Sequence, residues 1–118
     1  MPWTYNQTTG QLTYNNEQVA TGYSGAGAGR NNPQLEAVQN VGPIPAGRYT
    51  IGGAYNTATH GPHVMRLTPV GHNARGRSGF LIHGDNINHT ASQGCIILPR
   101  NIRDRISNSN DHDLTVTP

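Results

Sequence analysis

The residues with the clearest chemical potential are a lone cysteine and a histidine that precedes it. Cys95 is the only cysteine in the chain, and a polar loop, 84–94, separates it from His83. A thiol becomes a strong nucleophile when an imidazole takes its proton or stabilises its thiolate. Short apolar runs at 80–82 and 96–98 flank the loop and indicate two neighbouring buried strands. His83 would end the first strand and Cys95 would begin the second, so the sequence predicts a cysteine acyl-transferase.

The residues around this pair fit the same chemistry. Ser92 and Gly94 are small, so a substrate carbonyl can approach the backbone there, and the amides of Gly94 and Cys95 are predicted to form an oxyanion hole. Either Ser92 or a backbone carbonyl is expected to orient the imidazole of His83. Asp85 lies two residues beyond His83, where it either orients the ring or caps the loop. The competing interpretation is that Cys95 is a buried, inert structural cysteine.

The elements that must position these residues are mostly short strands. Runs of alternating or β-branched residues between turn signals predict strands at 3–5, 11–14, 18–21, 48–51, 63–68 and 113–117. Helix signals predict two short helices, at 32–38 and 101–106. A glycine-rich segment, 22–32, has neither the Walker A nor the dinucleotide spacing, so we expect a flexible rim loop there. The chain is therefore expected to be a single, mainly antiparallel β domain covering residues 1–118.

Composition excludes several classes of function. The chain of 118 residues has eight arginines, no lysine and a net charge of +2. With few aromatic residues and no basic run, nucleic-acid binding is not expected, whereas guanidinium groups favour a ligand that carries carboxylates. No apolar run approaches the ~20 residues of a membrane span, and the first residues do not form a signal peptide. We expect a protein made in the cytoplasm without a signal peptide.

Three segments carry a resemblance to a known family. They read GPIPAGRYTI at 42–51, IHGD at 82–85 and SQGCI at 92–96. Together they resemble the catalytic domain of L,D-transpeptidases, and they are most similar to the small branch of L,D-transpeptidase and carboxypeptidase effectors delivered by type VI secretion. The resemblance extends from Trp3 to about Leu98. It implies a mainly β fold, a β-sandwich with one or two short helices.

The resemblance also implies roles for individual residues. Cys95 would be the nucleophile, His83 the base, Ser92 a supporting residue, and the Gly94 and Cys95 amides the oxyanion donors. No cofactor or metal is implied. Gln93 stands where the wider family usually has a histidine. The usual arginine after the cysteine is missing, and the residues expected to substitute for it are Arg66, Arg100 and Arg103.

The implied substrate is the tetrapeptide stem of peptidoglycan. The thiol would attack the carbonyl at the L-centre of diaminopimelate and release D-Ala, and water, a D-amino acid or a second stem would resolve the thioester. Asp85, Arg66 and Gln93 are the predicted substrate-binding residues, with Asp85 meeting the amine of diaminopimelate. An effector of this kind would be secreted into the periplasm of a target cell. Its expected partners are a cognate immunity protein and a component of the secretion machine.

Two alternatives stay open on the sequence alone. One is a non-catalytic β-sandwich module for adhesion or phage structure, in which Cys95 is unreactive. The other is a zinc-dependent cell-wall hydrolase, because the chain contains suitable ligands in His60, His63, His72, His83, His89 and Cys95. No HExxH or CxxC spacing supports zinc. A papain-like peptidase is disfavoured because its cysteine precedes its histidine and opens a helix.

Overall fold

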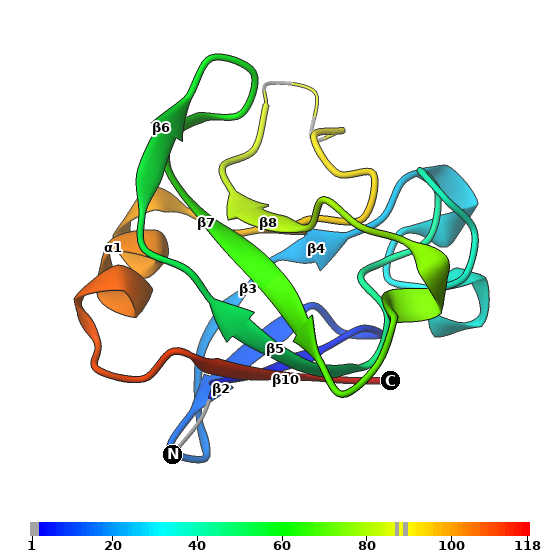
Figure 1. Cartoon of the computed structure of the whole chain (residues 1–118). Coiled ribbons are helices and arrows are strands. Elements are labelled where there is room, and N and C mark those ends of the chain that lie inside the picture. Colours follow the sequence, from blue (N-terminus) through cyan, green and yellow to red (C-terminus); the bar gives the residue numbers. More distant parts are fainter. Residues whose placement is uncertain (1–2, 87, 89) are drawn as a thin grey trace.

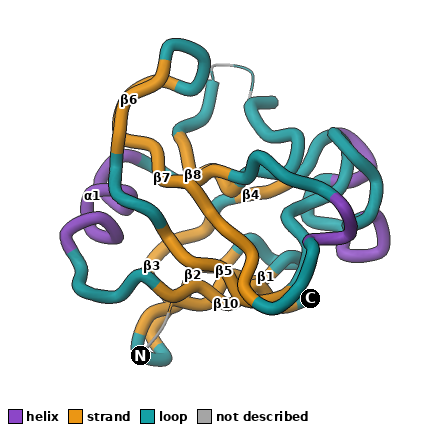
Figure 2. Tube along the Cα trace, in the orientation of Figure 1, coloured by secondary structure: helices purple, strands orange, loops and turns teal. Residues whose placement is uncertain are grey.

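The computed structural model describes residues 3–86, 88 and 90–118. These residues form a mainly β structure, as Figures 1 and 2 show. They contain one α-helix, α1 (Arg100–Asn108). The strands are β1 (Trp3–Asn6), β2 (Gln11–Tyr14), β3 (Glu17–Thr21), β4 (Tyr23–Ser24), β5 (Gly47–Ile51), β6 (Tyr55–Thr57), β7 (Gly61–Val70), β8 (Leu81–His83), β9 (Ile96–Ile97) and β10 (Asp113–Thr117).

The long strand β7 joins two halves of a mixed sheet. The strand order is β3-β2-β1-β10-β5-β7-β8-β9-β4, and β6 pairs with β7 outside this path. The second half of β7 pairs with β5, from Leu67 opposite Ile51 to Val70 opposite Arg48. Its middle pairs with β8, where Met65 lies opposite Ile82. In Figure 1, β7 runs diagonally from the lower strands to the part of the sheet that contains β8 and β4.

Parallel pairing brings the two ends of the described chain together. β1 pairs with β10 in parallel, so that Trp3 lies opposite Leu114 and Tyr5 opposite Val116. All four side chains are buried, consistent with one face of each strand pointing into the core. Trp3 also stacks on Tyr14 with ring centroids 4.2 Å apart. β1 and β10 therefore connect β2 and β3 to β5 within one half of the sheet.

One hydrophobic core connects both halves of the sheet with the helix. It includes Trp3 and Leu12 from the first half, Ile82 and Ile96 from the second, and Ile106 from α1. The isoleucines of the predicted helix, Ile102 and Ile106, both point into this core, as their spacing of one turn requires. The strands that flank the loop 84–94 are thus anchored in the centre of the protein.

The predicted fold class is confirmed, with corrections to individual elements. The chain is mainly β, and the eight expected strands are present within a few residues. The helix expected at 32–38 is only a 3-10 turn, Pro33–Leu35, capped by the side chain of Asn32 on the Gln34 amide. β4 and β6 were not predicted, because two or three residues are too few to show periodicity.

The glycine-rich segment 22–32 is not the flexible rim loop that its composition suggested. It contains β4 and a 3-10 turn, Gly27–Gly29, and it packs against other backbone. A Cβ atom on Gly29 would overlap the carbonyl group of Val41, and one on Gly25 would come 2.4–3.0 Å from Gly29 and Pro43. These glycines allow close backbone packing.

We predict that Gly29→Ala destabilises the protein while Gly53→Ala does not. Neither glycine has the positive φ that would strain an alanine, so the two changes differ in steric space alone. The added methyl group at position 29 meets the Val41 carbonyl, which should lower the free energy of unfolding by about 2 kcal/mol or more. A Cβ on Gly53 meets nothing within 4 Å, so its effect should stay within about 1 kcal/mol. Urea denaturation followed by circular dichroism would measure both; equal stabilities would contradict the packing argument.

Candidate active site

The predicted catalytic pair lies on two adjacent parallel strands. β8 and β9 pair in parallel, with Ile82 opposite Ile96 and His83 opposite Ile97. Cys95 immediately precedes β9, and the amide of Leu81 donates to its Sγ atom at 3.3 Å. Cys95 is therefore level with Leu81, and residues two apart on a strand share a face. The imidazole and the thiol point to the same face of the sheet, offset diagonally by about two residues.

His83 is held in a defined tautomer with one nitrogen available. Its Nδ1 atom lies 2.8 Å from the Gly84 carbonyl oxygen, which can only accept, so Nδ1 carries the proton. Nε2 is buried and has no hydrogen-bond partner among the described residues. Burial is the largest influence on this ring and lowers its pKa below the usual value for histidine. His83 is thus a neutral imidazole whose unprotonated nitrogen is ready to accept a proton.

Cys95 is partly exposed and is also kept neutral by its surroundings. Burial raises the pKa of the thiol, and the Leu81 amide and the positive charge of Arg77 oppose this increase only in part. Among the described residues, the contacts of Sγ are the Leu81 amide and the Gly79 carbonyl, at 3.3 and 3.9 Å. In the part of the chain that the structure describes, the thiol makes no hydrogen bond to His83. The pair is therefore neutral at rest, without a preformed thiolate and imidazolium.

A cavity of about 630 Å³ brings both residues into contact with the same space. The Cys95 cavity, as we call it, is lined by Cys95 and His83 together with residues of the loops around them. The other predicted site residues on its wall are Asp85, Gln93 and Gly94. A molecule in this cavity would lie against both residues, and nucleophilic catalysis with a general base needs a thiol and an imidazole at one site.

Ser92 supports the cysteine loop. Its hydrogen bonds within the described residues do not include one to His83. Its buried hydroxyl donates to the Cys95 carbonyl at 2.6 Å and accepts from the amides of Gly25 and Gly94 at 2.9 and 3.2 Å. Of the two orienting groups considered for His83, the backbone carbonyl of Gly84 is the one in contact. Because the Gly94 amide donates to Ser92 in this structure, the Cys95 amide is the better placed of the two predicted oxyanion donors.

The predicted substrate-binding residues are only partly brought together. Gln93 lines the Cys95 cavity, and its backbone carbonyl accepts from Arg77. Asp85 lies on the cavity wall, where its carboxylate accepts from the Tyr23 hydroxyl at 2.6 Å and from the Asn86 amide at 2.8 Å. Arg66 does not line the cavity; its guanidinium lies 5.8 Å above the ring of Tyr55.

Arg77 is the main site residue for which sequence reasoning assigned no role. Its buried guanidinium donates to four backbone carbonyl groups, those of Glu36, Gly42, Pro43 and Gln93, at 2.6–3.2 Å. It thus joins the GPIPAG turn to the loop that carries Cys95. A basic, glycine-containing loop is usually exposed, and nothing in the local pattern at 73–79 indicates that this arginine is buried.

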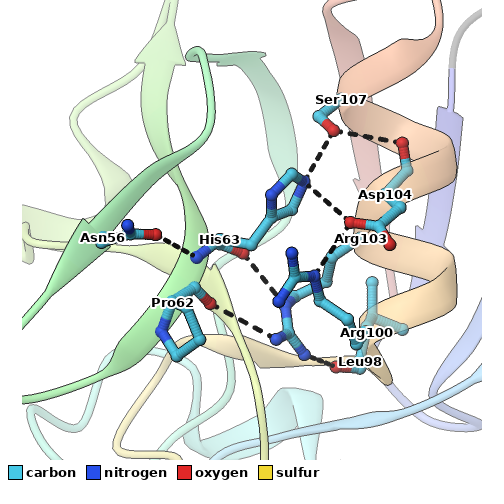
Figure 3. Close-up of polar contacts among 8 residues, drawn as sticks. All are labelled: Asn56, Pro62, His63, Leu98, Arg100, Arg103, Asp104 and Ser107. Carbon is cyan, nitrogen blue, oxygen red and sulfur yellow. Dashed lines mark hydrogen bonds and ion pairs between the residues drawn. The ribbon is translucent and has the colours of Figure 1, made fainter.

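The glycines beside the two reactive residues both pack against guanidinium groups. A Cβ atom on Gly94, whose φ is +134°, would lie 2.5 Å from an Nη atom of Arg77. One on Gly84 would lie 2.9 Å from Arg103. Arg103 is itself buried and donates to the carbonyl groups of Leu98, His63 and Pro62 (Figure 3). Arg103 was among the expected substitutes for the family arginine, and it does lie behind His83.

The histidines that the structure describes do not form the zinc site considered above. Within the described residues, no three His, Cys, Asp or Glu side chains are grouped as metal ligands; His89 lies outside those residues. His63 contacts Ser107 and Asp104, as Figure 3 shows. The ring of His60 lies against that of His83, with centroids 4.7 Å apart, and lines the same cavity.

Comparison with known families identifies the family of the chain. A family model described as the Tlde1 domain matches residues 18–116, which is most of the chain. The chain belongs to the Tlde1 domain family. This is a family of type VI secretion effectors with L,D-transpeptidase-like activity on peptidoglycan, so the expected effector family is confirmed. No curated protein matches the sequence significantly.

The family also defines where such proteins act. Tlde1 effectors are secreted and act on target cells. Among the described residues, no helix combines the length and the hydrophobicity that crossing a bilayer would require.

We predict that alkylation of Cys95 by iodoacetamide rises with pH through a midpoint above the ordinary thiol pKa of roughly 8.5. Only the thiolate reacts, and burial raises the pKa of this thiol. Mass spectrometry of quenched time points between pH 5 and 10 would give the rate constants. The same protein unfolded in urea, where Cys95 has its ordinary pKa, is the control. A rate that is already constant from pH 5 upward would show a preformed thiolate instead.

We predict that Arg77→Gln damages the site and that Arg75→Gln does not. Loss of the guanidinium leaves several buried carbonyl groups without a donor, which should lower the free energy of unfolding by about 2–4 kcal/mol. It also removes a positive charge that lowers the pKa of Cys95, so alkylation should shift to higher pH. Arg75 makes an exposed ion pair with Glu36 and should contribute less than about 1 kcal/mol. Similar losses in both variants, measured by denaturation and alkylation, would refute this assignment.

Proposed function

We propose that the protein is a cysteine enzyme that cleaves tetrapeptide stems of peptidoglycan at the L-centre of diaminopimelate. The observation that carries the proposal is that His83 lines the same cavity as the only thiol of the chain and has a buried Nε2 atom without a hydrogen-bond partner among the described residues. Membership of the Tlde1 family supports peptidoglycan as the substrate. The hydrogen bond from Nδ1 to Gly84 supports His83 as the base, because it keeps the proton off Nε2.

In the first step, Sγ of Cys95 attacks the carbonyl carbon that links diaminopimelate to D-Ala. His83 Nε2 takes the thiol proton as the C–S bond forms, and the carbonyl oxygen becomes an oxyanion. The Cys95 amide, with the Gly94 amide if it releases Ser92, would donate to that oxygen. When the C–N bond breaks, the imidazolium returns its proton to the leaving amine, so that D-Ala departs and a thioester remains.

In the second step, a nucleophile resolves the thioester. His83 takes a proton from water or from an amine as the new bond forms at the carbonyl carbon. The C–S bond then breaks, and the proton passes from the imidazolium to the Cys95 sulfur. Water gives L,D-carboxypeptidase activity, whereas a D-amino acid or a second stem gives exchange or cross-linking. The Cys95 cavity is large enough for a peptide substrate, at about 630 Å³. Asp85 and Gln93 on its wall are the proposed substrate contacts.

The proposal includes the biological setting that the effector family implies. An enzyme that alters peptidoglycan stems would harm a cell once it reached the periplasm, so the producing cell would need a cognate immunity protein. Association with a component of the type VI secretion machine would deliver it. Both partners are part of the proposal and follow from the family.

We predict that Cys95→Ala and His83→Gln abolish release of D-Ala from a diaminopimelate tetrapeptide. Removing the nucleophile should lower the rate by about 10³-fold or more, and removing the base by about 10²- to 10⁴-fold. Mass spectrometry of the peptide and of the intact protein would detect the product and a thioester on Cys95. The control is His112→Gln, an exposed histidine far from Cys95 in the sequence, which should retain full activity. Product formation by the Cys95→Ala variant would refute the proposal.

A further inference from the structure

A second cavity adjoins the Cys95 cavity and has no role in the steps proposed above. It measures about 550 Å³ and shares Gly84 and Asp85 with the Cys95 cavity, so these two residues form a common rim. We call it the arginine pocket because three of the eight arginines of the chain line it, namely Arg30, Arg100 and Arg103. Tyr23 and Asp85 also line this pocket. Its lining thus contains three cations and one carboxylate.

Tyr23 contacts both an arginine and the carboxylate. Arg30 lies over the face of its ring, and its hydroxyl binds Asp85. The Arg30 Cζ atom lies 3.8 Å from the centroid of the Tyr23 ring, and the Tyr23 hydroxyl donates to Asp85 Oδ1 at 2.6 Å. A guanidinium that stacks on an aromatic face keeps its N–H donors in its own plane, where they can bind a carboxylate edge-on. Opposite charges are therefore held at a fixed spacing along one wall of the pocket.

The beginning of helix α1 also lines the pocket, through Arg100 and Arg103. Arg103 is fixed there by the carbonyl groups of Leu98, His63 and Pro62, none of which neutralises its charge (Figure 3). Arg100 is exposed and binds Asp104 through Nε, while its two Nη groups remain additional donors of the fork. The helix starts after Pro99 without a side-chain cap, which adds a partial positive charge at the same end.

We propose that the arginine pocket binds the carboxylate of an amino-acid unit of the substrate. This inference rests on the proposed function and identifies which part of the substrate the pocket recognises. The side-chain centre of diaminopimelate carries a carboxylate beside an ammonium, and the pocket offers arginines beside Asp85. A carboxylate on the guanidinium groups and the ammonium on the rim carboxylate would place the rest of the residue toward the Cys95 cavity.

The experiment compares two tetrapeptides that differ only in this carboxylate. One contains diaminopimelate and the other L-lysine, which keeps the ammonium and lacks the carboxylate. Binding to the inactive Cys95→Ala protein is measured by calorimetry, with Arg30→Gln, Arg100→Gln and the double change added. Arg105→Gln is the matched control, because this arginine is also exposed on α1 and does not line either cavity.

We expect the diaminopimelate peptide to bind about 10-fold more tightly than the lysine peptide, and the double variant to remove this preference. Each single change should cost about 3-fold, Arg105→Gln should cost nothing, and added salt should weaken the preference. Because both arginine side chains are exposed, the variants should remain folded. Equal binding of the two peptides, or a preference that survives the double change, would show that the diaminopimelate carboxylate does not occupy the pocket.

A free D-amino acid acceptor is the other source of such a carboxylate. If it occupies the pocket, the double variant should raise KM for the acceptor in the exchange reaction while the tetrapeptide still binds as in the parent protein. An unchanged KM together with unchanged peptide affinity would overturn the subsite. Arginine-dependent binding without release of D-Ala by the wild-type protein would refute the reaction but retain the subsite. If the wild-type protein releases D-Ala but its affinity for the peptide and the acceptor does not depend on the arginines, the reaction is retained and the subsite is refuted.

Discussion

The position of the reactive thiol depends on a positive charge that is solvated by backbone carbonyl groups. Arg77 is buried, and four carbonyl oxygens from three different segments surround its guanidinium. A buried charge is costly unless it is fully hydrogen-bonded, so these segments are held in the one arrangement that satisfies it. One of them, Gln93, is next to the glycine that precedes Cys95. The site is therefore set by the requirement to solvate this arginine.

The GPIPAG turn has a structural role in this arrangement. It has no reactive side chain, yet its Gly42 and Pro43 carbonyl groups accept from Arg77. The Ile44 amide donates to the hydroxyl of Ser24, which in turn donates to the Gly94 carbonyl. Through these hydrogen bonds, the turn supports the cysteine loop. This explains how a segment far from Cys95 in the sequence can belong to the same family signature.

Two buried arginines, Arg77 and Arg103, act on Cys95 and His83, and both charges favour loss of a proton. Arg77 lowers the pKa of the Cys95 thiol, and Arg103 lowers the pKa of the His83 imidazolium, although burial is the larger influence on each. Each charge therefore favours the deprotonated form of the side chain it acts on: the thiolate of Cys95 and the neutral imidazole of His83. Burial dominates and keeps the thiol protonated. The resting pair is accordingly neutral, and in the proposed mechanism the proton would move as the substrate carbonyl is attacked.

The sequence alone determined the elements and the chemical identity of the pair. Branched apolar runs beside His83 and Cys95 predicted the two strands, the isoleucine spacing predicted α1, and the motif order predicted the family. These signals are local, because they depend on neighbours along the chain. The parallel pairing of β8 with β9, the hydrogen bond from the Gly25 amide to Ser92 and the burial of Arg77 and Arg103 are different. Each depends on segments that are distant in sequence, and a guanidinium that binds carbonyl groups leaves no pattern, since every residue carries one. Only the tertiary structure could decide them.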